Sequence, residues 1–492
     1  MKKLLLSASV VAGLFAAPTI DSLQKQINDL QQQLKELKTK QETQNDRYYK
    51  KVAPIVANNH LFWSLDLRTT YDAIKEDVKS GMGYKTIVPN QDGSVTFKDM
   101  GKIDSKTYKN HIFTNRVILT GVYKPSDNLK ATVKAEVNNV FGMNAADQYS
   151  PYQNISWVAN ETPDDTNFRL KEAYFNYFFG DDFMFSAGRR PATEGFPANL
   201  REGDEPASPL AHLINMEFDG FSFKIGNGEF SKISDKFGDW GTWLKFCLGR
   251  GYSSTKGKWP YNNDPANSKD RLHNADFGGF LFVPYDDGQY SIWTETVWAW
   301  DMKGYNFATP ADAANAMAGN DFTASMQDLG NYFGFNMILK ADGIGDGISD
   351  FLDDTKAFVS YAISKTKPDS GKQMLGSTDK ETGHSVWVGA DMPGFKDGDR
   401  FGVSYVHGSE YWRNFTFGED TLIGSIAAVR GHAFDVYYNT EIIPHLTAGL
   451  RYTYIKYDHA GSDSFFGLSG NPDQDVYVEK ARDLRAFIRY NF

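Results

Sequence analysis

About sixteen segments of this chain alternate between apolar and polar residues, and this alternation constrains the fold more than any other feature. Residues 129–138, for example, read LKATVKAEVN. Strict alternation predicts β-strands with one apolar and one polar face. Most segments are longer than the roughly five or six residues usual for soluble strands and match the roughly nine to eleven that cross a bilayer at a tilt. They cover residues 61–72, 111–123, 129–141, 168–179, 183–190, 214–226, 241–252, 276–285, 290–302, 330–341, 355–366, 384–392, 400–412, 431–442, 446–458 and 480–492.

The connections between these segments are alternately short and long. KPSDN, GDD, DDG and IPH have the composition of tight turns. The long connections are residues 73–110, 142–167, 191–213, 253–275, 303–329, 367–383, 413–430 and 459–479. Two expected turns, 227–240 and 342–354, are looser and allow a strand count that differs by two. Short turns on one side and long loops on the other are typical of outer-membrane barrels. We therefore expect an all-β fold, a transmembrane antiparallel β-barrel of about sixteen strands, over residues 61–492.

The first 17 residues have the three parts of a secretory signal peptide. Two lysines at positions 2 and 3 precede an apolar stretch over residues 4–15, and two alanines follow it. The stretch is too short for a permanent membrane anchor, and no later run is long and apolar enough for a membrane-spanning helix. A buried structural helix is the alternative, which the two lysines disfavour. We expect an exported chain whose cleavage site is left open by Pro18.

Residues 18–50 carry a heptad pattern, and residues 51–60 follow it as a linker. The pattern consists of Ile20, Leu23, Ile27, Leu30, Leu34 and Leu37 at a and d positions. Because such a seam needs a partner, it predicts a short N-terminal α-helical coiled coil, about 27 Å long at 1.5 Å per residue. We expect it to lie in the periplasm and to hold a homo-oligomer together. A solvated linker helix is the alternative.

Charge and cysteine content exclude several functions. The 52 Lys and Arg against 62 Asp and Glu give a net charge of −10, or −12 once the two lysines of the signal are removed. An acidic chain is a poor candidate for binding nucleic acid. Cys247 is the one cysteine of the sequence, which excludes an intrachain disulfide and a multi-cysteine metal site. Its surroundings indicate a small residue on one face of a strand.

The chain ends on LRAFIRYNF, residues 484–492, in which apolar residues alternate with Arg485, Arg489 and Asn491. Alternating apolar residues before a final Phe resemble the C-terminal strand of bacterial outer-membrane proteins. The resemblance implies that Tyr490 and Phe492 belong to an assembly signal read by the barrel-assembly machinery. We expect this strand to close the barrel, with its apolar residues towards lipid.

A second resemblance covers residues 169–203, RLKEAYFNYFFGDDFMFSAGRRPATEGFPANLREG, and residues 215–226, NMEFDGFSFKIG. With the signal, the coiled coil and the terminal strand, these segments resemble a porin-like outer-membrane family of unknown function from epsilon-class proteobacteria. The resemblance implies a barrel in contact with lipid of the bacterial outer membrane, and it implies no substrate. Related general porins form trimers, so a trimer is expected by analogy.

Charged residues of the polar parity are the candidates to line the lumen. They are Arg116, Lys130, Lys134, Glu136, Glu172, Arg190, Arg451, Arg485 and Arg489. Turn length sets two registers among them. A three-residue GDD loop places Glu172 opposite Arg190, and a five-residue KPSDN turn places Arg116 beside Glu136. We expect both pairs as cross-strand neighbours inside the barrel. Aromatic residues near strand ends are expected in the outer girdles, and they include Trp298, Trp300, Tyr411 and Trp412.

The connection 191–213 is rich in proline and charge. Its charged residues are Glu194, Arg201, Glu202, Asp204 and Glu205. A solvated surface loop is one interpretation, and a constriction folded into the lumen is the other.

The sequence contains no nucleophile elbow of the Gly-x-Ser-x-Gly type, no Walker loop and no His-Glu-x-x-His motif. His384 and Ser385 are adjacent, but neighbours on a strand point to opposite faces and cannot act as base and nucleophile. A catalytic triad spread over several strands is the alternative. Residues 341–354 resemble a calcium loop in part, but Ile344 stands where an oxygen ligand is needed, so a Gly- and Asp-rich turn is favoured. We expect no cofactor, no metal and no enzyme activity.

These features together favour a porin through which small hydrophilic solutes or ions diffuse passively. The alternative is a surface-exposed structural or adhesive barrel whose lumen is closed and whose long loops bind other cells.

Overall fold

The computed structural model describes residues 60–84, 86–98, 100–141, 168–253, 272–345, 347–416, 421–462, 464 and 466–492. The expected signal peptide, coiled coil and all but the last residue of the linker lie outside these residues and stay predictions. Within the described ranges, no helix is long and apolar enough to span a bilayer.

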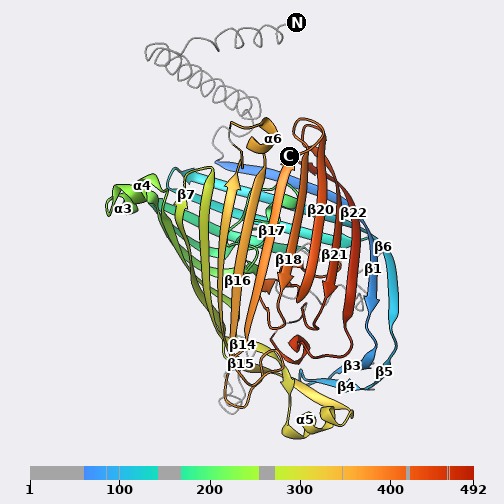
Figure 1. Cartoon of the computed structure of the whole chain (residues 1–492). Coiled ribbons are helices and arrows are strands. Elements are labelled where there is room, and N and C mark those ends of the chain that lie inside the picture. The colour runs from blue at the N-terminus through green and yellow to red at the C-terminus, as the bar shows by residue number, and fades with distance from the viewer. Residues whose placement is uncertain are drawn as a thin grey trace, which may run out of the picture. The chain divides into compact units, whose positions relative to one another are not determined.

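Sixteen antiparallel strands close into a barrel, as the alternation predicted (Figure 1). Each strand pairs with the next along the chain, and the last strand pairs with the first, so the wall has no free edge. The first eight are β1 (Leu61–Val78), β6 (Lys106–Ser126), β7 (Leu129–Val140), β8 (Arg169–Phe179), β9 (Phe183–Arg190), β11 (Phe218–Ile225), β12 (Trp243–Tyr252) and β13 (Ala275–Asp286). The others are β14 (Tyr290–Phe307), β15 (Phe322–Asp342), β16 (Lys356–Pro368), β17 (Thr382–Pro393), β18 (Arg400–Gly408), β20 (Gly431–Ile443), β21 (Leu446–Tyr457) and β22 (Val478–Asn491).

Shorter elements lie in the connections. The strands are β2 (Gly81–Gly83), which pairs with β5 (Gly101–Ile103); β3 (Thr86–Pro89), which pairs with β4 (Val95–Lys98); and β10 (Ile214–Asn215), which runs parallel to β19 (Phe415–Thr416). The α-helices are α3 (Asn227–Ser231), α4 (Asp235–Asp239), α5 (Pro310–Met317) and α6 (Asp350–Asp353). The 3-10 helices are η3 (Ala198–Arg201), η5 (Ile426–Ala428) and η6 (Leu468–Gly470).

The short connections and the C-terminus lie at one end of the wall, which we call the turn end (Figure 1). Helix α5 and the hairpin of β3 and β4 lie at the opposite end, which we call the loop end. The GDD turn joins β8 to β9 as predicted, and Gly180 there has the positive φ of 64° that glycine adopts without strain. The predicted five-residue KPSDN turn is wrong. Because β6 continues to Ser126, with an irregularity between Tyr123 and Ser126, a two-residue turn at 127–128 suffices.

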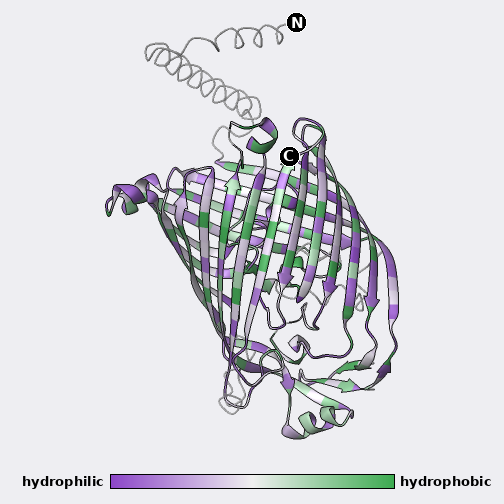
Figure 2. Cartoon of the chain, in the orientation of Figure 1, coloured by the Kyte–Doolittle hydropathy of each residue, from purple (hydrophilic) through white to green (hydrophobic). Residues whose placement is uncertain are grey.

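The outer surface of the wall is largely apolar, and the inner surface carries many charged residues. In β22, Leu484 and Ile488 are 44% and 54% exposed, whereas Arg485 and Arg489 are 1% and 8% exposed. Figure 2 shows the corresponding alternation of hydrophobic and hydrophilic residues along the wall strands. This distribution is the reverse of that in a soluble protein, and it is stable only where the outer face meets apolar surroundings.

Apolar clusters of wall and loop residues occupy part of the barrel interior. One apolar cluster joins wall residues such as Ile74 of β1, Leu281 of β13 and Val406 of β18 to Phe196 and Leu210 of a long connection. Residues 191–217 form this connection, and we call them the inner loop. A second cluster lies beside it and also mixes wall and loop residues.

Candidate functional site: the lumen and its inner loop

The inner loop lies inside the ring of strands. The backbone carbonyl of Arg201 accepts a hydrogen bond of 2.8 Å from Asn439 of β20, and the ring of Phe196 meets Phe358 of β16 edge-on at 5.4 Å. Glu202 forms an ion pair with Arg68 of β1. Because these partners come from three separated sectors of the wall, the loop spans the lumen between them.

The tip of the inner loop is held by a charged cluster, which we call the arginine network. It consists of Arg68, Arg116 and Arg489 from the wall, Asp66 of β1, and Glu194, Glu202 and Asp204 from the loop. Glu202 lies 3.2 Å from Arg116 and 3.3 Å from Arg489. Asp204 accepts two hydrogen bonds from Arg489, of 2.7 and 2.9 Å, in the bidentate geometry that guanidinium favours.

Glu194 sits at the side of this network, with one oxygen 3.4 Å from Arg116. Burial opposes its ionisation, but the positive charges of Lys171, Arg116 and Lys134 outweigh burial and lower the pKa of Glu194. Glu194 is therefore a carboxylate at neutral pH. Glu205, by contrast, is exposed.

A water-accessible cavity of about 510 Å³ adjoins the arginine network at the turn end of the barrel. Its lining is mostly polar and comes from the wall and from the inner loop. The charged residues in it are Asp66, Arg116, Lys134, Glu194, Asp204, Glu205 and Arg489. Charged groups of both signs therefore line this end of the lumen.

A second group of inward charges lies on β7 and β8. Lys134 pairs with Glu172 at 2.7 Å, and Lys171 pairs with Glu136 at 3.1 Å. Lys171 is the extra residue of an irregularity between these strands, so it and Glu172 are both buried although they are neighbours. Parity predicted only Glu172 in the lumen. Lys171 was missed because the bulge breaks the alternation on which the prediction depended.

Both predicted cross-strand ion pairs need correction. The register of β8 and β9 is the predicted one, with Phe179 opposite Phe183 and Ala173 opposite Arg189. Glu172 nevertheless reaches across to Lys134 of β7, and Arg190 donates to Ser186 at 2.9 Å.

The predicted neighbour of Arg116 is also wrong. The register of β6 and β7 is shifted by two residues, so Arg116 lies opposite Asn138 and not beside Glu136. The shift follows from the shorter turn, which the irregularity in β6 makes possible. The inward orientation of the predicted residues is as expected, since Arg116 and Glu136 are 2% and 0% exposed.

The remaining predicted lumen residues lie on the inner face. Arg451 and Arg485 are buried; Arg451 lies 3.7 Å from Asp435, and Arg485 lies 2.6 Å from Asp72. Lys130 is half-buried. In the inner loop, Arg201 also reaches Asp435, at 3.3 Å.

His212 anchors the other end of the inner loop. Its ring nitrogens lie 2.7 Å from the Ser360 hydroxyl and 2.8 Å from the Ser385 hydroxyl. Burial lowers the pKa of His212 to about 3, so the ring is neutral, with one nitrogen donating and the other accepting. Ser360 in turn donates to Asn336, and within the described part of the chain no carboxylate is hydrogen-bonded to the imidazole. The arrangement positions a loop, and it lacks the third member of a catalytic triad.

Two further loops, the connection that follows β18 and the connection that follows β21, fold inward and meet the inner loop. Arg430 donates to the carbonyl oxygens of Trp412 and Gly470 at 2.9 and 2.7 Å. Phe415 of β19 pairs with Ile214 of β10. Trp412, which the sequence placed in an outer girdle, is fully buried here because β18 ends at Gly408 and the chain then turns inward. Trp298 and Trp300 are exposed on the outer face, as expected.

The C-terminal residues close the wall. The backbones of Phe492 and Leu65 exchange two hydrogen bonds of 2.9 Å. Tyr490 and Phe492 are 39% and 63% exposed on the outer face. Their role as an assembly signal stays a prediction.

The described residues contain no group of three or more His, Cys, Asp or Glu side chains arranged to hold a metal ion. In the turn that resembles a calcium loop, Asp342 pairs with Lys340 at 3.3 Å, and Ser349 caps α6. Asp346 lies outside the described residues.

Residues 106–492 match a protein family described as "Protein of unknown function (DUF3373)". No curated protein sequence matches the chain. Solved structures with a similar course of the chain include an anion-selective porin from Comamonas acidovorans, with 11% identity, a TM-score of 0.43, and 88% of this chain and 100% of that chain covered. OprB of Pseudomonas putida has 12% identity, a TM-score of 0.46, and coverage of 89% and 96%. The outer-membrane channel DcaP of Acinetobacter baumannii has 14% identity, a TM-score of 0.41, and coverage of 88% and 97%. At these TM-scores the likenesses say nothing about function.

Proposed function

Since this chain belongs to the DUF3373 family, whose function is unknown, we propose a function from its own barrel: an outer-membrane porin through which small hydrophilic solutes or ions diffuse passively. The observation that carries the proposal is the pairing of an apolar outer face with a lumen that holds the charged residues. A bilayer supplies the apolar surroundings that such an outer face requires, and a closed barrel satisfies every backbone hydrogen bond within it.

The inner loop sets the width of the path in this proposal. The arginine network fixes the loop tip to β1, β6 and β22, beside the charged cavity at the turn end. Fixed charges of both signs at a constriction exclude large and apolar solutes and favour small hydrated ones. We therefore expect a narrow channel and not a wide general pore. Glu194, Arg201, Glu202, Asp204 and Glu205 are the proposed constriction residues.

A barrel with a closed lumen is the second candidate, and a specific observation favours it. Apolar clusters inside the ring join the inner loop to wall strands on several sides, and buried arginines hold the other loops together. In that case the loops at the loop end would be the functional surface, with a structural or adhesive role.

The rest of the proposal concerns location and assembly. The turn end would face the periplasm, since the C-terminus and the short connections lie there. The barrel would contact outer-membrane lipid and require the barrel-assembly machinery. The heptads of residues 18–50 would hold a homo-oligomer, with a trimer expected by analogy.

Liposome swelling tests the proposal. Vesicles containing the folded full chain should swell in an isotonic pentose solution faster than vesicles without protein, and more slowly or not at all in a trisaccharide solution. Protein unfolded by heat before reconstitution is the control. No swelling with folded protein would favour the closed barrel, and equal swelling with both sugars would contradict the narrow constriction.

A further inference from the structure

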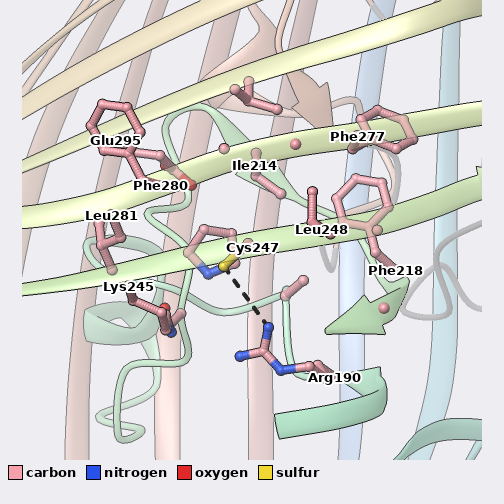
Figure 3. Close-up of a pocket in the computed structure, with 18 of the residues that line it drawn as sticks. Arg190, Ile214, Phe218, Lys245, Cys247, Leu248, Phe277, Phe280, Leu281 and Glu295 are labelled. Carbon is pink, nitrogen blue, oxygen red and sulfur yellow. Dashed lines mark hydrogen bonds between the residues drawn. The ribbon is translucent and has the colours of Figure 1, made fainter. Parts of the chain in front are cut away.

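A pocket lies between the wall and the inner loop, apart from the arginine network (Figure 3). Strands β11 to β14 form one side of it, and Pro191, Ala192, Ser208, Pro209 and Ile214 of the loop form the other. The water-accessible volume is about 80 Å³. At roughly 10–15 Å³ per water molecule, this volume accommodates a ligand of about five to eight heavy atoms.

Small residues on the inner face of the wall create the space. Gly220 of β11 lies opposite Gly249 of β12, and Gly279 of β13 lies opposite Cys247 of β12. A Cβ atom at Gly279 would lie 2.1 Å from the carbonyl oxygen of Thr296, so a larger residue does not fit there. The wall is therefore hollowed at this level.

One end of the pocket is cationic. Arg190 donates to the Ser186 hydroxyl at 2.9 Å and lies 3.9 Å from Sγ of Cys247, the contact drawn in Figure 3. Lys245, 7% exposed, donates to the Ser208 hydroxyl at 2.5 Å. Among the described residues, no carboxylate lies within 4 Å of either charged group. A buried cation without a counter-charge is costly, and a bound anion would remove that cost.

The rest of the pocket is apolar except for its far end. Phe218, Phe277, Leu281 and Val297 contribute apolar surface. Glu295 of β14, 3% exposed, lies two strands away from Lys245.

We propose that this pocket binds a small amphipathic monocarboxylate, with its carboxylate against Arg190 and Lys245 and its apolar body against the apolar lining. Two fixed cations match the two oxygens of one carboxylate, and Arg190 stays charged at any physiological pH. The proposed binding depends on the geometry of the pocket and not on whether the lumen conducts. A failure to bind a monocarboxylate and a failure to conduct solutes are therefore separate results.

Calorimetric titration of the folded, detergent-solubilised full chain tests the proposal, with pentanoate as the probe. We expect saturable binding at one site per chain, and binding at least about tenfold weaker for 1-pentanol and pentylamine, which lack the carboxylate. Pentanedioate should bind more weakly than pentanoate, because its second carboxylate would lie against the apolar lining. No saturable binding of pentanoate, or equal binding of 1-pentanol, would overturn the proposal.

Matched variants locate the site. Arg190→Gln and Lys245→Met should each weaken pentanoate binding at least about tenfold. Arg189→Gln, which alters an outward arginine paired with Asp219, and Lys224→Met, which alters an inward lysine outside the pocket lining, should leave binding unchanged. Equal losses in all four folded variants would refute the assignment.

A second readout uses the chain's one thiol without any substitution. Pentanoate at saturation should slow the alkylation of Cys247 by a small neutral thiol reagent, and 1-pentanol at the same concentration should not. Alkylation that proceeds at the same rate with saturating pentanoate would place the ligand elsewhere.

Discussion

Replacing Glu202 by Gln tests the anchoring of the inner loop most sharply. Glu202 is shared by three guanidinium groups: it pairs with Arg68 and lies 3.2 Å from Arg116 and 3.3 Å from Arg489. Gln keeps the shape and one acceptor oxygen but removes the charge. The three arginines then share one carboxylate fewer in a buried place.

The cost follows from what remains around the arginines. Breaking a buried ion pair destabilises a protein by roughly 3–5 kcal/mol where nothing replaces the lost charge. Here Asp66 and Asp204 still face Arg489, and Glu194 still faces Arg116. Because these carboxylates and the water of the adjoining cavity compensate in part, we expect a loss of about 2 kcal/mol in the free energy of unfolding.

Urea unfolding of the protein in lipid vesicles, followed by tryptophan fluorescence, measures this loss. Glu205→Gln is the matched control, since it removes an exposed carboxylate from the same loop, and it should change the free energy by less than about 0.5 kcal/mol. Equal effects of the two substitutions would refute the assigned anchoring role of Glu202.

Four further outcomes follow from the same reasoning. Between about pH 6.5 and pH 4, His212 becomes protonated in the unfolded chain and stays neutral in the folded chain. As the pH falls through this range, the free energy of unfolding should therefore decrease by about 3 kcal/mol more than in His212→Gln. Parallel urea titrations of the two proteins measure this difference, and identical pH slopes would contradict it. Lys171→Met should destabilise the barrel by about 3 kcal/mol and Lys134→Met by about 1 kcal/mol, because the first lysine is 1% exposed and the second 25%; the reverse order in urea titrations would show that burial does not set the cost. Removal of Phe492 should lower the amount of folded protein in outer-membrane fractions while stability after folding in vitro changes little, and a normal amount would exclude an assembly signal. Deletion of residues 18–50 should alter the oligomer seen by native mass measurement and leave the barrel folded, and an unchanged oligomer would exclude the coiled-coil role.

The strands and their faces were predictable because both are local properties. A strand with one apolar face must alternate, so the sixteen segments and the inward side of Arg116, Arg485 and Arg489 follow from parity alone. Arg68 and Asp66 of the arginine network also stand on the polar parity of β1, and the same rule applied to that strand finds them.

Irregularities and tertiary contacts were not predictable in the same way. The irregularity between Tyr123 and Ser126 shortens a turn and shifts a register by two, and the one at Lys171 turns two successive residues inward. Neither leaves a mark in the alternation. Folding of the inner loop into the lumen depends on pairs such as Arg68 and Glu202, which are 134 positions apart in the chain. The sequence therefore favoured a surface loop and left the constriction as the alternative.

Single-channel conductance in planar lipid bilayers tests the central claim most directly, when the full chain is compared with a variant in which a short Gly and Ser linker replaces residues 198–206. This segment carries Glu202 and Asp204, which fasten the loop tip to the wall. The full chain should give steady ohmic steps, and the shortened loop should give larger ones because the constriction is removed. Silence from both folded proteins, or steps of the same size, would contradict a membrane channel narrowed by its inner loop.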